Sequence, residues 1–244
     1  ATLTRNEVKK SLPWIAFGRK MYVLHAVSVF GVMASLLILI HTHSFEYKYI
    51  WEHTSKSSPF YYQFSAMWSG QEGSTLLWMF WHGVLGCVLI FKAKEWESPV
   101  LSIVALAQVL LGSMLLGIHL FGYKFGSSPF ALMRDTMDIP VFKMNPDWVA
   151  EDGTGLNPSL QNYWMVIHPP TLFLGFAACT IPAAYAIASL WVKDFTGWIK
   201  PVLPWSLFAM MILGTGILLG GAWAYEALSF GGFWAWDPVE NASL

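Results

Sequence analysis

The last fifteen residues, 230–244, hold the side chains best suited to chemistry, and we call them the aromatic motif. Three aromatic rings fall within four positions, a pair of glycines precedes them, and an acidic Asp-Pro turn follows. The candidate ligand-binding residues of this motif are Phe230, Gly231, Gly232, Phe233, Trp234, Trp236, Asp237, Glu240 and Asn241. Flat apolar rings beside a few polar groups suit a large planar ligand. The alternative is a belt at the membrane surface, where Trp and Phe also collect.

A single histidine, His168, is the candidate metal ligand that goes with this aromatic wall. It stands directly before Pro169 and Pro170, which favours the mouth of a helix whose regular part starts near Pro169. Haem iron takes a neutral imidazole as an axial ligand. Glycines 231 and 232 would let the backbone approach the ring of such a ligand closely. A histidine that only caps its neighbours is the alternative interpretation.

The acidic residues of the motif have two interpretations, and both stay open at this point. Asp237 and Glu240 are suited to orient a ligating imidazole through a hydrogen bond. The same residues predict a helix start, with Asp237 as N-cap, Pro238 at the first position and Glu240 at the third.

The composition predicts the elements that must position these groups. The 244 residues are 55% hydrophobic and only 12% charged, whereas soluble domains have about 25% charged residues, so we expect an all-α polytopic membrane protein. A net charge of −1 without a long basic run argues against nucleic-acid binding. We expect one integral-membrane domain over 1–244, a fragment of a longer chain, with two outer loops at about 42–74 and 122–163. The expected spans are 21–41, 75–91, 99–121, 164–192 and 203–228.

The distribution of basic residues predicts the direction of these spans. Segments 1–20, 92–98 and 193–202 together hold nine Lys/Arg, and the longer loops on the other side hold five. The positive-inside rule therefore places the N-terminus inside and the aromatic motif outside. His41, His43 and His53 are expected to be solvated in the first outer loop, whereas His25, His82 and His119 fall within spans. Cys87 and Cys179 are expected to be buried, inert thiols.

Four strings in order resemble one family. They are GQEGSTLLW at 70–78, NPSLQ at 157–161 with IHPP at 167–170, GGAWAYE at 220–226, and WAWDPVENAS at 234–243. The last is similar to the tryptophan-rich "WWD" haem-handling signature of the cytochrome c assembly superfamily, and its continuation resembles the CcmF-type branch. The chain departs from that pattern at Phe230 and Phe233, where the family often has Trp, and at Gln71, where it often has His.

The resemblance implies a haem lyase component of cytochrome c maturation in the bacterial inner membrane, with its functional face periplasmic. Haem b would arrive as substrate from a CcmE-type haem chaperone and be joined to the CxxCH thiols of apocytochrome c, with a CcmH-type thiol-handling partner. His168 matches the family's first external haem-ligating histidine. The ligands of an internal haem b would lie beyond residue 244. No catalytic residue of this chain is implied.

Three rival functions are a membrane electron carrier that binds haem, a CcsA-type haem exporter or synthetase, and a solute transporter. A carrier needs paired histidines at helical depth, and only His25 and His82 qualify. A transporter predicts broken helices and polar residues near the middle of the membrane. Neither the carrier nor the transporter explains four strings in the same order.

Overall fold

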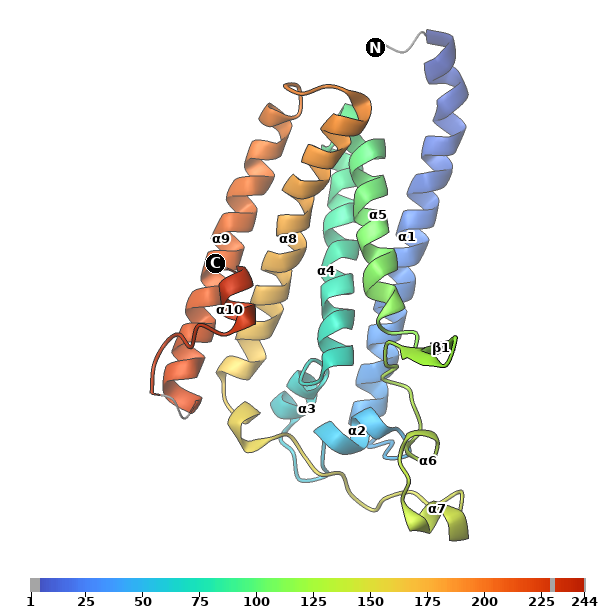
Figure 1. Cartoon of the computed structure of the whole chain (residues 1–244), viewed down its shortest axis with the longest axis vertical. Helices are drawn as coiled ribbons and strands as arrows, with labels where there is room; N and C mark the ends of the chain where they lie inside the picture. Colours follow the sequence, from blue (N-terminus) through green and yellow to red (C-terminus); the bar gives the residue numbers. More distant parts are fainter. Residues whose placement is uncertain (1–4, 229–230, 244) are drawn as a thin grey trace.

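The computed structural model describes residues 5–228 and 231–243, and for 5–12 and 119 it describes the backbone alone. Long helices run side by side to form the body of the molecule (Figure 1). They are α1 (Arg5–His41), α4 (Gln71–Lys92), α5 (Glu97–Ser113), α8 (Trp164–Val192) and α9 (Ile199–Ala227). Among the described residues, five helical segments are long and apolar enough to cross a membrane, so the predicted all-α polytopic class is confirmed.

The short elements gather mostly at one end of the bundle, opposite the α8–α9 turn (Figure 1). They are α2 (Lys48–His53), α3 (Phe60–Ala66), β1 (Ile118–Leu120), β2 (Tyr123–Phe125), α6 (Met133–Thr136), α7 (Pro140–Met144) and the 3-10 turn η2 (Pro158–Leu160). The other 3-10 turn, η1 (Lys94–Trp96), joins α4 to α5. The last helix, α10 (Pro238–Ser243), lies beside α9 because the chain folds back after Ala227 (Figure 1).

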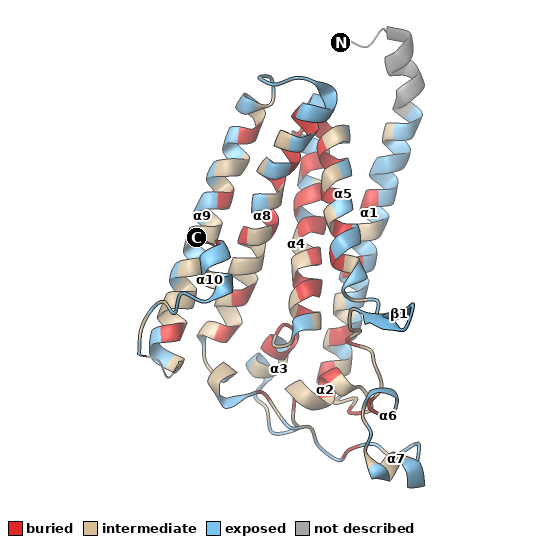
Figure 2. Cartoon of the chain, viewed as in Figure 1, coloured by how far each residue is buried: buried red, intermediate tan, exposed pale blue. Residues whose placement is uncertain are grey.

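Burial is concentrated on the middle helices of the bundle. Figure 2 shows buried residues along α4 and the facing sides of α5 and α8, with wide exposed surfaces on α1 and α9. Half of the most apolar window of α4 is buried, against 17% for those of α1 and α9. The exposed side chains include Phe30 and Met210, which favour a lipid surrounding over water. Helix α4 is therefore the axis around which α1, α5 and α8 pack.

The third predicted span is wrong at its outer end. Helix α5 stops at Ser113, and the chain then forms a small antiparallel hairpin in which Ile118 pairs with Phe125. Glycines 117, 122 and 126 all have positive φ, a conformation that fits the hairpin and not a continued helix. His119 therefore belongs to strand β1 and not to a span.

The predicted start of the regular part of the fourth helix, near Pro169, is also wrong. Helix α8 begins at Trp164, five residues before Pro169, so His168 lies inside the second turn and not at the mouth. A proline lacks the backbone N–H that an interior helical position donates, so Pro169 cannot bond the carbonyl of Met165. That carbonyl has another donor, the indole of Trp68 at 2.9 Å, which compensates the loss.

Candidate functional site

His168 lies at the contact between α8 and α9, and its ring is fixed by the backbone of α9. Its Nδ1 is 2.9 Å from the carbonyl oxygen of Gly216. A carbonyl only accepts, so this geometry assigns the proton to Nδ1 and leaves Nε2 with its lone pair. Nε2 has no hydrogen-bond partner within the described part of the chain. This is the tautomer that a metal-ligating histidine takes when its other nitrogen is held by a carbonyl.

Small residues of α9 make room for the imidazole. A Cβ added at Gly220 would lie 2.6 Å from Cε1 of His168, far inside an ordinary contact. One turn earlier, a Cβ at Gly216 would lie 2.9 Å from Cα of Leu172. The ring of Trp223 lies beside the imidazole, with 5.8 Å between centroids. The two glycines therefore let α8 and α9 approach closely enough for the imidazole to reach the α9 backbone.

The aromatic motif packs on the neighbouring face of α9. A Cβ at Gly221 would lie 3.2 Å from the carbonyl oxygen of Phe233, so this glycine also allows a close approach. The ring of Phe233 stacks on Tyr225 at 4.4 Å, with only 4° between planes. Two successive glycines of α9 thus have different neighbours: Gly220 contacts His168, and Gly221 contacts the aromatic motif.

The acidic residues of the motif form the predicted helix start. The Asp237 carboxylate accepts the backbone N–H of Glu240 at 2.7 Å, and the Glu240 carboxylate accepts that of Ala235 at 2.7 Å. The N-cap interpretation is confirmed. The structure does not show Asp237 or Glu240 orienting an imidazole. The ring of His168 is held by the carbonyl oxygen of Gly216 instead.

The centre of the motif is exposed and has an unusual backbone. Trp236 is 68% exposed and has φ of +57°, a left-handed conformation that is costly for a bulky residue. Asn241 donates its side-chain amide to the Trp236 carbonyl at 2.9 Å, which helps to hold this conformation. Trp234 meets Trp236 edge-to-face at 5.9 Å. The result is an indole that projects from a capped turn.

The glycine pair at the start of the motif has different environments. Gly231 has φ of +70°, which favours glycine, and Gly232 is half-buried. Phe230 lies outside the described residues.

Sequence reasoning missed the contacts that hold the first turn of α8. On one side, the indole N–H of Trp164 donates to the carboxylate of Glu226 at the end of α9. On the other, the indole of Trp68 donates to the Met165 carbonyl. Glu226 belongs to the GGAWAYE string, but nothing in the sequence indicates that Trp164 is its partner.

The GQEGSTLLW string has a packing role in the structure. The buried hydroxyl of Tyr49 donates toward the carbonyls of Ala66 and Met67, both 3.0 Å away, and accepts the N–H of Gly70 at 3.2 Å. A side chain at Gly73 would collide with Met67 and Tyr49. Burial raises the pKa of Tyr49 well above its ordinary value, so the phenol stays protonated and keeps donating. The contacts of Tyr49 therefore hold the first outer loop against the start of α4.

The candidate histidines of a carrier point to different neighbours. The ring of His82 is buried, with Nδ1 3.0 Å from the Trp78 carbonyl and Nε2 2.9 Å from the Thr180 hydroxyl of α8. His25 lines a groove of about 1040 Å³ between α1 and α5. Both ring nitrogens of His82 are therefore engaged within the protein, which does not favour His82 as one of a pair of haem ligands.

Two smaller expectations are also corrected. His41 is exposed as predicted, but His43 and His53 are half-buried, and His53 stacks on Tyr49 at 4.3 Å. Cys179 is exposed on α8, and Cys87 is half-buried.

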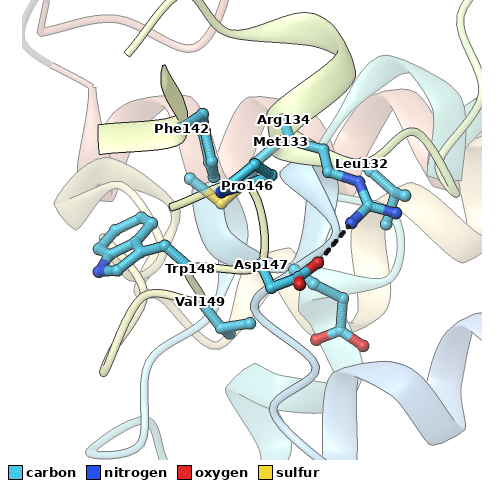
Figure 3. Close-up of a pocket in the computed structure, with 9 residues that line it drawn as sticks. Leu132, Met133, Arg134, Phe142, Pro146, Asp147, Trp148 and Val149 are labelled. Atoms are coloured by element: carbon cyan, nitrogen blue, oxygen red, sulfur yellow. Dashed lines mark hydrogen bonds and ion pairs between the residues drawn. The ribbon is translucent and has the colours of Figure 1, made fainter. Parts of the chain in front are cut away.

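A second pocket lies among the outer loops, apart from the predicted site (Figure 3). It encloses about 330 Å³ and contains the Arg134–Asp147 ion pair at 3.3 Å, beside Phe142 and Trp148. Its lining includes none of the predicted ligand-binding residues. The contacts of His168 and the motif therefore remain the candidate site.

Comparison with known proteins decides the family. A family model described as "Cytochrome C assembly protein" matches residues 68–244, which contain both His168 and the motif. The chain belongs to the cytochrome c assembly family. Among curated members, the cytochrome c-type biogenesis protein CcmF of Haemophilus influenzae is 36% identical over 94% of this chain and 33% of its own length. CcmF of Escherichia coli is 35% identical over 89% of this chain and 31% of its own length.

A solved member of the cytochrome c assembly family supports the same assignment. The structure of "Cytochrome c Heme Lyase CcmF" matches with a TM-score of 0.73 and 27% identity, over 95% of this chain and 34% of that one. The chain thus spans about a third of the length of the relatives it matches. The resemblance to the CcmF-type branch is confirmed.

Proposed function

We propose that this chain contributes the haem-holding part of a cytochrome c haem lyase. The observation that supports it best is the arrangement on α9, where Gly220 contacts His168 and Gly221 contacts the aromatic motif. The imidazole of His168, with a lone pair on Nε2, and the flat rings of the motif therefore both pack against α9. The names of the similar proteins, cytochrome c-type biogenesis protein and haem lyase, point to the same chemistry.

The residues present fit haem as substrate. His168 would be the axial ligand. The hydrogen bond from its Nδ1 to the Gly216 carbonyl would keep Nε2 unprotonated and hold the ring in one orientation. Phe233, Trp234 and Trp236 would supply apolar faces, and Phe230 and the glycines 231 and 232 would border them. Asp237, Glu240 and Asn241 would act indirectly, by holding the turn that projects Trp236.

The reaction needs positioning more than a reactive side chain of the protein. A cysteine S–H adds across a haem vinyl group, so one S–C bond forms and the proton goes to the other vinyl carbon. The haem and the two thiols contribute every atom of the new bonds, and we assign no catalytic residue. The chain would hold the ring so that its vinyl edge stays open to an incoming thiolate.

The partners in this proposal follow from the same chemistry. Haem would come from a CcmE-type haem chaperone, the acceptor would be the CxxCH segment of apocytochrome c, and a CcmH-type partner would keep its thiols reduced. The site would face the periplasmic side of the bacterial inner membrane. The excess of Lys/Arg in 1–20, 92–98 and 193–202 supports that orientation.

The test is cytochrome c assembly by the intact protein that contains this segment. We expect His168→Ala and Trp236→Ala to abolish or strongly reduce mature c-type cytochrome. The matched control is His25→Ala, since His25 faces the groove between α1 and α5 and should leave assembly unchanged. Normal assembly with both His168→Ala and Trp236→Ala would refute the proposal.

A further inference from the structure

The turn that carries His168 has a built-in defect. In a regular helix, the backbone N–H of residue 169 would donate to the carbonyl of residue 165. Pro169 has no N–H, so the carbonyl of Met165 has no helical donor. Met165 lies three residues before His168 in the same helix. Met165 is buried, with 3% of its surface exposed, so water is not a ready replacement. A buried carbonyl of this kind needs another donor.

Trp68 supplies that donor from a distant part of the chain. Its indole Nε1 donates to the Met165 carbonyl at 2.9 Å, across a separation of 97 residues, and Trp68 is only 4% exposed. The ring is itself held in place, edge-to-face with Phe64 at 5.0 Å. The Ser74 hydroxyl donates to the Trp68 carbonyl at 2.8 Å. The outer loop therefore holds the indole N–H of Trp68 in place to donate to the carbonyl oxygen of Met165.

We propose that Trp68 is a positioning residue for His168, an inference that rests on the proposed haem-holding function. Its indole N–H replaces the helical bond that Pro169 removes and so keeps the first turns of α8 in register. The direction of the His168 ring toward Gly216 and Gly220 depends on that register. Pro169 would thus be compatible with an ordered His168 because the Trp68 indole replaces the hydrogen bond that the proline removes.

The experiment is a cycle of two substitutions in the intact protein. Trp68→Phe removes the indole N–H and leaves a smaller aromatic ring, whereas Pro169→Ala restores a backbone donor to the Met165 carbonyl. With Pro169 present, we expect Trp68→Phe to weaken haem binding by about tenfold, in line with leaving a buried acceptor unpaired. In the Pro169→Ala background, the same change should weaken binding less than about twofold, because the oxygen already has a donor.

Two further measurements separate positioning from simple packing. Backbone hydrogen exchange at 163–168, measured without haem, should rise in Trp68→Phe and return toward the starting rate in the double variant. The matched control is Trp81→Phe, which removes an indole N–H that has no acceptor among the described residues. This control should change neither exchange at 163–168 nor haem binding.

The possible outcomes distinguish this inference from the proposed function. Equal losses from Trp68→Phe in both backgrounds would show that only packing is involved and would overturn the positioning role. If the unsubstituted protein binds no haem through His168, the proposed function fails. The exchange measurement would still decide whether Trp68 holds the turn.

Discussion

The contact between Gly220 and His168 gives the sharpest prediction, since one methyl group should displace the imidazole. A Cβ at residue 220 would lie 2.6 Å from Cε1 of His168, whereas ordinary van der Waals contact begins at 3.4 Å. In Gly220→Ala the ring must therefore move by about 0.8 Å, or α8 and α9 must separate. Such crowding typically costs ~1–3 kcal/mol. A ligand displaced by about 1 Å can lose on the order of a hundredfold in activity.

The assay is haem titration of the intact protein followed by absorbance, together with its thermal unfolding in detergent. The matched control is Gly214→Ala in the same helix, where an added Cβ would meet nothing within 4 Å. That control should bind haem normally and be unchanged or up to ~1 kcal/mol more stable, because alanine favours a helix. If Gly220→Ala binds haem as tightly as Gly214→Ala, the ring of His168 does not depend on this contact and the reasoning is wrong.

Three further predictions concern the surroundings of the site. Asp237→Ala should fray α10 by ~1 kcal/mol, seen as faster hydrogen exchange at 239–243, whereas Asp237→Asn should retain most of the cap. Tyr49→Phe should lower the free energy of unfolding by ~1–3 kcal/mol, because it leaves buried groups of the outer loop unpaired; an unchanged unfolding temperature would contradict this. The Lys56 backbone N–H holds the pKa of Asp152 below its ordinary value, so this carboxylate stabilises the outer loops above about pH 4, and that contribution is lost as the pH falls through the lowered pKa. Acid-induced loop opening, followed by hydrogen exchange, should lose this component in Asp152→Asn.

Local patterns in the sequence predicted the elements well where the deciding interactions are local. The span at 164–192 coincides with α8, because a long apolar run is a property of the segment itself. The cap at Asp237 was predicted because its donor is only three residues away. The end of α5 was misplaced because hydropathy continues past Ser113, whereas the glycines of the following hairpin act through backbone conformation.

The contacts that build the candidate site could not be predicted in this way. The partner of His168 is a backbone carbonyl 48 residues away, and a carbonyl has no signature in a sequence. The regular part of α8 was predicted to start too late, near Pro169, because this proline removes a local bond and Trp68 replaces it from the outer loop. Sequence order identified the candidate residues, and tertiary packing determined which of them touch.

The most direct measurement asks whether His168 ligates haem in the intact protein. Haem spectra would be compared for the unsubstituted protein, for His168→Gly, and for His168→Gly with added imidazole. If His168 is the axial ligand, we expect the absorbance of the haem bound there to be lost in the variant and restored by imidazole, because the free ligand can replace the missing ring. A haem spectrum that is unchanged by His168→Gly would show that His168 does not ligate haem and would contradict the proposed function.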